Sequence, residues 1–359
     1  MKKLFILIST ALLSVGAFAQ TEEAAQPEYG YKLTDFASKP KFGAYIIGSY
    51  KYSDLEGANQ GPGFGVRLVR AYVDGSILND FKYRLQVELN GTPHIKDFYL
   101  EWAKYKEFSV KMGEFKRAFT FENPYNPWDV GTGDYSQAVK KLAGMGDRCG
   151  EASVGGRDLG LQVQGDLFPI GQDQHRLVHY QLGLYNGNGI NKNDNNARKD
   201  IIGTLQIQPI KDLYLGVFGW DGNWSDGTVT VDRIRYALGA KYEHNNWSAR
   251  AEYVHSNGYK ASSIDPATGK LKLGSPDTGR ADAFYATVGI PFKPWFKVYA
   301  KYDLYRDFAN SDSANTIYSL APQFRLHKNL MFQFEYRYND NKLTGKKYNE
   351  FWFEYYVRF

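Results

Sequence analysis

The chain has 359 residues and a formal net charge of +5, from 44 basic and 39 acidic residues. This near balance excludes the strongly basic character typical of nucleic-acid-binding proteins. A mean hydropathy of −0.50, with no apolar run of about 18 residues after the N-terminal segment, excludes membrane-spanning helices. The single cysteine, Cys149, excludes an intramolecular disulfide, and we expect it to be a spare thiol in a loop.

The N-terminus has the features of a secretory signal peptide. Lys2 and Lys3 precede an apolar run that ends at Phe18, and Ala17 and Ala19 are the small residues of a cleavage site. We predict cleavage after Ala19 and export of the mature chain. Without the two lysines of the signal, 42 basic and 39 acidic residues remain.

The mature chain divides into a short lead-in and one long folded domain. Residues 20–39 are small, polar and acidic at the start, which predicts a periplasmic lead-in. After residue 40, apolar and polar side chains alternate, a period that is typical of β-strands. The alternation is strictest in five segments: 81–89, 158–167, 233–243, 330–339 and 350–359. Each is about nine residues long, which suits a tilted strand that crosses a bilayer.

Weaker alternation fills the rest of residues 40–359. It predicts further strands at 41–51, 64–77, 95–102, 108–113, 176–186, 201–209, 213–220, 247–255, 283–292, 296–305 and 316–326. The total of about sixteen is even, as a closed single-chain barrel requires. The fold class that we predict is therefore an all-β transmembrane antiparallel barrel, apolar towards lipid and polar towards a wet lumen. A secreted soluble β-sandwich is the alternative.

The connections between these strands alternate in length. Short ones lie at 78–80, 104–107, 210–212, 244–246, 293–294 and 328–329, and long ones at 187–199, 221–228, 257–280 and 306–314. Outer-membrane barrels have short turns on the periplasmic side and long loops outside. This pattern places both chain ends on the periplasmic side of a bacterial outer membrane.

One connection, residues 116–156, is much longer than the others. Residues 134–142 predict a short helix inside it, with Asp134 as N-cap and Gly144 near its end. Loops of this length are usually functional. By analogy with general porins we predict that this third external loop folds into the lumen as the constriction. A surface lid or a partner-binding loop is the alternative.

Five motifs in this order resemble the phosphate-selective porin O and P family: Arg67-Leu-Val-Arg70-Ala-Tyr-Val-Asp-Gly75, Asp80–Glu88, Lys96–Glu101, Lys111–Lys116 and Gly156–Gly160. The resemblance implies a sixteen-stranded outer-membrane porin that forms a homotrimer, with basic side chains at its eyelet. Carried onto this sequence, it implies such roles for these residues: Arg67, Arg70, Lys116, Arg117, Lys140 and Lys141.

The inward phase of the strands adds further pore-lining candidates. The basic ones that we single out are Lys82, Arg84, Lys111, Arg233, Arg235, Lys297 and Lys301. Acidic side chains share this phase in similar number, so a mild preference for anions is a hypothesis. A weakly selective pore with charges paired across strands is the alternative. Eight aromatics also take the inward phase: Tyr99, Tyr185, Tyr214, Phe218, Trp220, Tyr285, Tyr299 and Tyr305. We expect several of them near the rims, as part of the interfacial aromatic girdles, rather than in a slide for sugars.

These patterns predict a porin for passive diffusion of small hydrophilic solutes, with anions or phosphate as preferred solutes by hypothesis. The expected partners are outer-membrane lipid and the barrel-assembly machinery, which would read the terminal Phe359; no cofactor or metal is expected. A plugged barrel with a structural or adhesive role is one alternative. An enzyme on a barrel is the other, although the sequence has neither a G-x-S-x-G elbow nor an HExxH motif.

Overall fold

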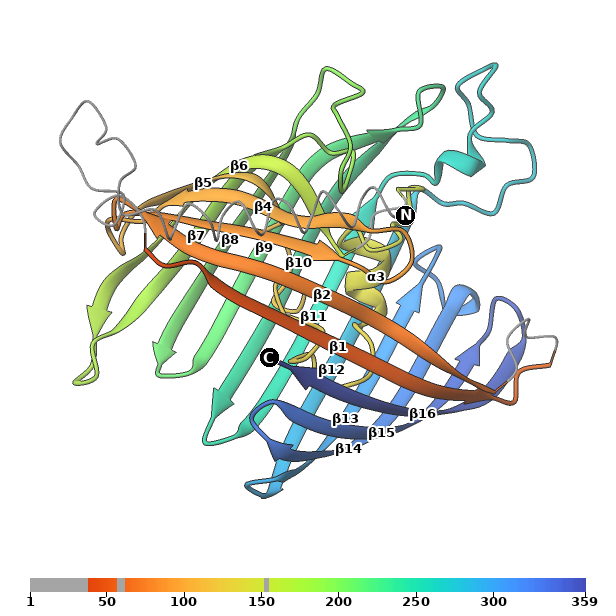
Figure 1. Ribbon diagram of the computed structural model, residues 1–359. Helices are drawn as coiled ribbons and strands as arrows, with labels where there is room; N and C mark the ends of the chain where they lie inside the picture. The colour runs from red at the N-terminus through yellow and green to blue at the C-terminus, as the bar shows by residue number, and fades with distance from the viewer. Residues whose placement is uncertain (1–37, 57–61, 152–154) are drawn as a thin grey trace.

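The computed structural model describes residues 38–56, 62–151 and 155–359 (Figure 1). Within them sixteen strands form one closed barrel, in which every neighbouring pair is antiparallel. The predicted fold class is confirmed. The predicted signal peptide, residues 1–19, and nearly all of the lead-in, residues 20–39, lie outside the described residues.

The strands follow one another around the barrel in chain order. They are β1 (Lys41–Ser53), β2 (Gly63–Ile77), β3 (Phe81–Glu88), β4 (His94–Trp102), β5 (Ser109–Lys116), β6 (Arg157–Ile170), β7 (His175–Tyr185), β8 (Asp200–Ile210), β9 (Leu213–Ser225), β10 (Thr230–His244), β11 (Trp247–Asn257), β12 (Arg280–Lys293), β13 (Phe296–Arg306), β14 (Ala314–His327), β15 (Leu330–Asn341) and β16 (Lys346–Arg358). Short helices occur in three connections: α3 (Gln137–Leu142), η1 (Ala261–Ser263) and η2 (Ser311–Ser313). In the described part of the chain, none of the helices has the length and apolar character needed to span a membrane.

Pairing of the first strand with the last closes the barrel. Tyr45 lies opposite Arg358, and the ladder runs on to Ser53 opposite Glu350. Beyond it, the backbone N–H of Phe359 donates to the carbonyl of Ala44 at 2.9 Å. Closure leaves no unpaired strand edge, so the backbone groups of every strand are satisfied inside the sheet.

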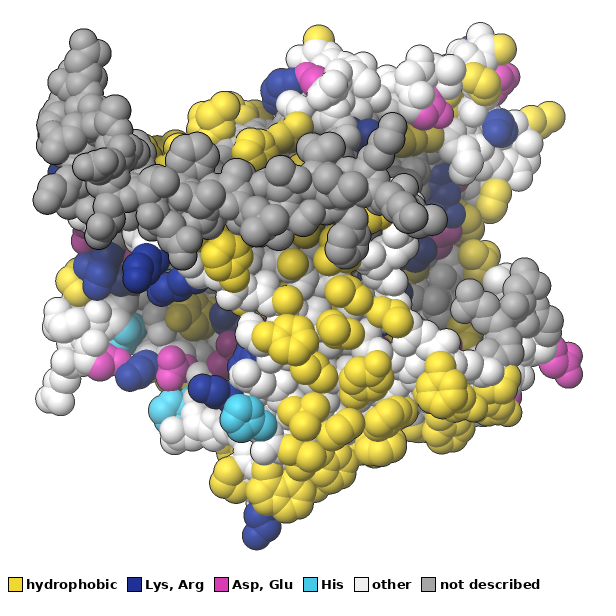
Figure 2. All heavy atoms as spheres, in the orientation of Figure 1, with side chains coloured by type: hydrophobic (Ala, Val, Ile, Leu, Met, Phe, Trp, Pro, Cys, Tyr) yellow, Lys and Arg dark blue, Asp and Glu magenta, His cyan; other side chains and the backbone are white. Residues whose placement is uncertain are grey.

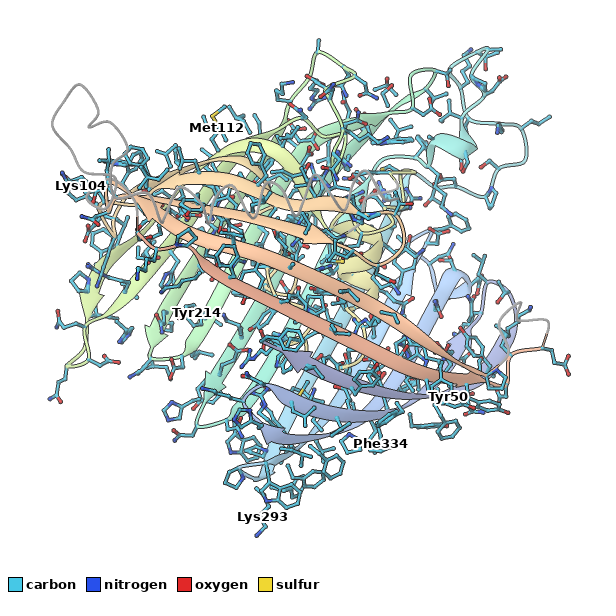
Figure 3. The ribbon with its side chains drawn as sticks, viewed as in Figure 1. Tyr50, Lys104, Met112, Tyr214, Lys293 and Phe334 are labelled. Atoms are coloured by element: carbon cyan, nitrogen blue, oxygen red, sulfur yellow. The ribbon has the colours of Figure 1, made fainter. Side chains whose placement is uncertain are left out.

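The two faces of the sheet have opposite character. Met112 and Phe334 point away from the barrel and are 68% and 49% exposed, while Glu335 on the same strand as Phe334 is buried inside (Figure 3). Apolar side chains crowd the outer surface over β1 and β14–β16 (Figure 2). An apolar exterior around a charged interior is the inverse of a soluble protein and matches a barrel in lipid.

The connections differ between the two rims. The β10–β11 turn consists of Asn245 and Asn246, whose φ angles of 46° and 68° give the tight hairpin geometry that asparagine tolerates. The connection that leaves the other rim after β11 extends over residues 258–279 and contains η1. Lys104 lies among the short turns, at the left of Figure 3.

The longest connection, residues 117–156 between β5 and β6, is called the inner loop below. Its helix is shorter than predicted and begins later. Ser136, not Asp134, is the N-cap of α3, and its hydroxyl accepts from the Val139 N–H at 3.3 Å. Asp134 instead accepts from the Lys140 ammonium at 2.5 Å. Both residue types cap helices well, so the sequence alone favoured the wrong one.

Candidate functional site

The inner loop lies inside the barrel and contacts inward carboxylates on several strands. The backbone N–H of Phe121 donates to Glu252 on β11 at 2.6 Å. That of Gln137 donates to Asp303 on β13 at 3.0 Å. The N–H of Gly133 donates to a carboxylate of β15. These bonds hold the loop against the inner face of β8–β16, which we call the far wall.

Apolar packing strengthens this attachment. The buried side chains of the loop form one cluster with inward aromatics of the far wall, Phe218, Trp220, Tyr285 and Tyr305, and with Tyr185 at the end of β7. These five of the eight inward aromatics pack against the loop in the lumen rather than near the rims, because the loop supplies an apolar partner there. At the other end of the barrel interior, Trp128 of the loop packs edge-on against Tyr356, with ring centroids 5.5 Å apart.

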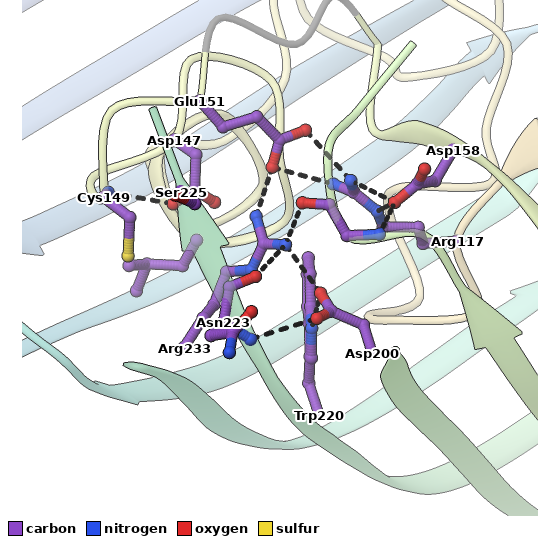
Figure 4. A network of polar contacts seen from close by, with 12 residues as sticks. Arg117, Asp147, Cys149, Glu151, Asp158, Asp200, Trp220, Asn223, Ser225 and Arg233 are labelled. Carbon is purple, nitrogen blue, oxygen red and sulfur yellow. Dashed lines mark hydrogen bonds and ion pairs between the residues drawn. The ribbon is translucent and has the colours of Figure 1, made fainter. Parts of the chain in front are cut away.

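A buried ion network anchors the base of the loop (Figure 4). Arg117 lies 2.9 Å from Glu151 and 2.7 Å from Asp158, and both carboxylates are fully buried with it. Arg233 of β10 contacts the same Glu151 and lies 2.6 Å from Asp200 of β8. Because every charge has a buried partner, the network meets the condition under which ions are tolerated in an interior.

Aromatic and backbone contacts complete this network. The Trp220 indole N–H donates to Asp200 at 2.8 Å. The guanidinium of Arg233 lies over the Trp220 ring, 4.7 Å from its centroid. Arg233 also donates to the carbonyl of Gly187 at 2.5 Å. The positive charge of Arg233 is therefore compensated by groups of the protein itself.

A second anchor holds the later part of the loop. Arg235 makes a two-pronged contact with Asp147, at 2.5 and 2.7 Å, and donates to the Leu142 carbonyl at the end of α3. Burial alone would raise the pKa of the Asp147 carboxyl, but the adjacent Arg235 outweighs it and holds that pKa below its usual range. Arg148 lies 2.6 Å from Asp277, in the connection after β11.

The opposite side of the loop faces open space. A cavity of about 240 Å³ separates residues 124–127 of the loop from the inner face of β1–β7, which we call the near wall. Its charged lining is Arg70, Arg84, Asp97, Lys111, Lys116, Arg117 and Arg157. Six cations and one carboxylate make this cavity a basic site, and it is our candidate functional site.

Three of the six cations use every side-chain nitrogen in hydrogen bonds within the protein. Arg117 is bound to its two carboxylates. Arg157 donates twice to Asp97, at 2.8 and 2.9 Å, and once to the Gly155 carbonyl. Lys116 donates to two loop carbonyls and, at 3.1 Å, to the Tyr135 hydroxyl. These residues shape the cavity and add to its positive field.

The other three keep donors free. Arg70 uses Nε and Nη1 on Glu88 and Tyr45, and Arg84 uses Nε and Nη2 on Asp74. The remaining terminal nitrogen of each makes no hydrogen bond within the described parts of the chain. The Lys111 ammonium has Glu101 as its ion-pair partner, at 3.4 Å. Arg70, Arg84 and Lys111 are therefore the cations that can meet a passing anion.

A β-bulge explains how Arg67 and Arg70, three residues apart, both face inward. Ile47 of β1 lies opposite Leu68, and the next residue, Gly48, lies opposite Val66, so Arg67 is the extra residue. Its guanidinium lies 3.2 Å from Glu354 of β16. Arg67 is thus in the lumen but outside the cavity.

The remaining predicted candidates also lie elsewhere. Arg233 and Arg235 are in the two anchors. Lys140 and Lys301 both contact Asp134, at 2.5 Å to its carboxylate and 2.9 Å to its carbonyl. Lys141 is exposed on α3, and Lys297 lies over the Tyr299 ring.

A second cavity, of about 650 Å³, adjoins the first. Gln164 and Gln181 belong to the walls of both. Lys82 lines the second cavity together with residues 103–106 of the β4–β5 turn. The two cavities thus lead along the near wall to the rim of short turns. In the described part of the chain, no group of histidine, cysteine or acidic residues could hold a metal ion.

Comparisons with known proteins agree with the barrel. The sequence model of a family described as Gram-negative porin matches residues 9–344. The fold is similar to the anion-selective porin from Comamonas acidovorans, with a TM-score of 0.66 and 14% identity over 90% of this chain and 100% of that chain. It is also similar to Salmonella typhi OmpF in complex with daunomycin, with a TM-score of 0.65 and 10% identity over 92% of this chain and 99% of that one.

A third similar structure is the in-vitro folded OmpT of Vibrio cholerae in its trimer form, with a TM-score of 0.58 and 16% identity over 90% of this chain and 100% of that chain. No curated protein sequence matches the chain. At these identities the likeness to solved structures shows the fold alone.

Proposed function

Because the chain belongs to the Gram-negative porin family and is an outer-membrane channel for small solutes, we propose that it passes anions in preference to cations, along the near wall. The narrower resemblance to the phosphate-selective porin O and P family stays a prediction. Selectivity in a pore is set at its narrowest charged ring rather than by its total charge. We place that ring at the basic cavity, with the inner loop as the constriction.

The free donors of Arg70, Arg84 and Lys111 carry this proposal. Each of the three has one acidic partner, Glu88, Asp74 or Glu101, which offsets part of its positive charge. In the other cations of the cavity, Arg117 among them, every side-chain nitrogen already makes a hydrogen bond within the protein. We therefore expect a moderate preference for anions and not an anion-only pore.

The test is the reversal potential of purified protein in a planar bilayer under a KCl gradient. The double variant Arg70→Gln/Arg84→Gln should move the reversal potential towards that of a non-selective pore. Glu88 keeps Lys96 as a partner at 3.4 Å in this variant, and the side chain of Asp74 is one-third exposed. Lys297→Gln, which removes a lumenal charge outside the cavity, is the matched control and should leave the potential unchanged. Cation selectivity of the native protein would contradict the proposal.

Phosphate titration in the same bilayer tests the solute suggested by the O and P resemblance. Block of the current by low phosphate would support a phosphate-type channel. A current indifferent to phosphate would support a general diffusion porin. Cleavage after Ala19, recognition of Phe359 by the assembly machinery and a homotrimer are parts of the same proposal. The trimer form of the similar OmpT structure supports the last of these.

A plugged barrel is the second candidate, and one observation favours it. The inner loop is bonded to inward residues of β11, β13 and β15, and Trp128 packs on β16. A loop attached so widely could close the channel. Solute flux into proteoliposomes separates the two functions, since a plugged barrel would give no swelling with small sugars.

A further inference from the structure

The near wall carries neutral amides as well as cations. Gln86, Gln162, Gln164 and Gln181 all line the basic cavity. They come from β3, β6 and β7, and the last two extend into the second cavity. A small inorganic anion gains little from such a row, because its hydrogen bond to a neutral amide is weaker than one to a charged guanidinium.

Three of these amides form a hydrogen-bonded chain. The Tyr185 hydroxyl donates to Gln162 at 2.6 Å, and Gln162 in turn donates to Gln164. Gln164 donates to Glu101 at 2.7 Å and accepts from Gln181 at 3.5 Å. Each amide has both donor and acceptor groups, so the chain can exchange its bonds for those of a hydroxylated solute.

Gln86 stands apart from this chain. The residue as a whole is only 3% exposed, but its amide atoms are open to the cavity and make no hydrogen bond to any residue that the structure describes. A side chain of this kind in a cavity wall points to a partner that comes from the cavity itself.

Aromatic rings lie beside the cations. The Lys111 ammonium lies 4.8 Å from the Tyr99 ring centroid and 5.6 Å from that of Phe115. Tyr45, whose hydroxyl accepts from Arg70 at 2.9 Å, and Tyr125 of the inner loop line the same space. Apolar ring faces next to polar groups suit the C–H surfaces of a sugar-like carbon chain.

We propose that the cavity is a binding subsite for small polyhydroxylated carboxylates, the class of sugar acids. The carboxylate would meet the free donors of Arg70 and Arg84, whose planar guanidinium groups suit its two oxygens. The hydroxyl groups would lie along the amides, with Gln86 first and Gln181 towards the rim of short turns. The inference rests on the proposed anion preference and names the solute class for that same site.

The volume of the cavity agrees with this size of solute. At ~30 Å³ per water molecule, 240 Å³ holds about eight waters. A six-carbon sugar acid would displace most of them and exchange water hydrogen bonds for those of the wall. The binding must stay weak, because a pore that holds its solute tightly does not conduct it.

The experiment measures inhibition of the chloride current through a planar bilayer by three probes: potassium gluconate, potassium acetate and sorbitol. Gluconate has both the carboxylate and the hydroxyls, acetate only the first and sorbitol only the second. We expect half-inhibition by gluconate at a concentration about tenfold below that of acetate, from two or three additional hydrogen bonds, and no inhibition by sorbitol in that range.

The double variant Gln86→Leu/Gln181→Leu should remove the advantage of gluconate over acetate. Neither amide has a strong hydrogen bond within the protein, so the variant removes little internal bonding. Gln174→Leu, in an exposed turn, is the control and should retain the advantage. Heat-modifiable gel migration verifies that each barrel is folded, and the single variant Gln181→Leu replaces the double one if assembly fails.

Three outcomes would overturn the inference: equal inhibition by gluconate and acetate, an advantage of gluconate that survives in the double variant, or phosphate inhibiting as well as gluconate. In each of these the proposed anion preference would stand. A cation-selective native pore would instead remove the proposed function itself, and the reversal potential shows this before any probe is added.

Discussion

The strongest test of how the inner loop is held is replacement of Arg233 by leucine. Arg233 is fully buried and joins Glu151 of the loop to Asp200 of the far wall. Removing one partner of a buried ion pair costs about 3–5 kcal/mol, because the remaining charge is left without compensation. Leucine fills part of the space and supplies none of the charge.

Only part of this cost weakens the attachment of the loop. Asp200 belongs to β8 and keeps the Trp220 indole and the Asn223 N–H as donors. Glu151 belongs to the loop and keeps Arg117, at 2.9 Å. If the cost divides about equally, the docked loop loses ~2 kcal/mol. At 1.4 kcal/mol for each factor of ten, the population of the undocked loop rises about 30-fold.

Cys149 reports this change without any label being added. It is the single cysteine of the chain, lies within the loop and is 1% exposed. When the loop recloses faster than a thiol reagent reacts, the labelling rate is proportional to the undocked population. We expect maleimide labelling of folded protein in detergent to be slow in the native chain and about 30-fold faster in Arg233→Leu.

Two further variants make the test sharp. Arg233→Lys keeps the charge but loses the planar fork that contacts both carboxylates, so it should label at an intermediate rate. Arg198→Leu removes an exposed ion pair with Asp221 at 2.5 Å, of a kind worth 0–1 kcal/mol, and should label like the native protein. Equal rates for Arg233→Leu and Arg198→Leu, with both barrels folded by heat-modifiable migration, would refute the anchor.

Three other outcomes follow from contacts of single residues. Burial, with Asp147 next to it, raises the pKa of the Cys149 thiol to about 11, so thiolate absorbance of the folded protein should appear near that pH. Because the unfolded thiol ionises at ~8.5, the folded state should lose stability as the pH rises from there to about 11. A thiolate already formed near pH ~8.5 in the folded protein would contradict this. Trp128→Ala removes a ring that packs against Tyr356 and is only 3% exposed. The variant should lose ~3–5 kcal/mol of folding free energy, which would lower the melting temperature and add noise to the open-channel current. An unchanged current trace and melting temperature would show that the ring does not hold the loop. Deletion of Phe359 removes a side chain that is 70% exposed, so folded protein should melt almost as before while its yield in cells falls, and a normal yield would count against a role in assembly.

Alternation along the strands predicted the barrel because a strand has a period of two and each face has one environment. Residues 81–89 and 330–339 show it without interruption, and the sixteen strands lie close to the predicted ranges. The same rule fails where a strand is irregular. Arg67 and Arg70 would face opposite sides of a regular strand, and only the bulge opposite Ile47 and Gly48 brings both inward.

The contacts of the inner loop could not be predicted from the sequence for a different reason. The sequence shows a loop with both signs of charge, but Glu151 meets Arg117 and Arg233, residues 34 and 82 positions away. Such pairings depend on the three-dimensional path of the loop and have no local signal. Arg157 and Gln86 were overlooked as site residues for the same reason, although both lie within predicted strands or motifs.

The division of the arginines between two tasks supports the proposed passage on one side of the loop. On the far wall Arg233 and Arg235 form ion pairs with carboxylates of the loop, and aromatic rings fill the space around them. On the near wall Arg70 and Arg84 are paired with carboxylates of their own sheet, which leaves a guanidinium nitrogen of each free. A cation that holds the loop through an ion pair cannot at the same time bind a solute, so the free nitrogens of Arg70 and Arg84 on the near wall are the ones that a solute can reach.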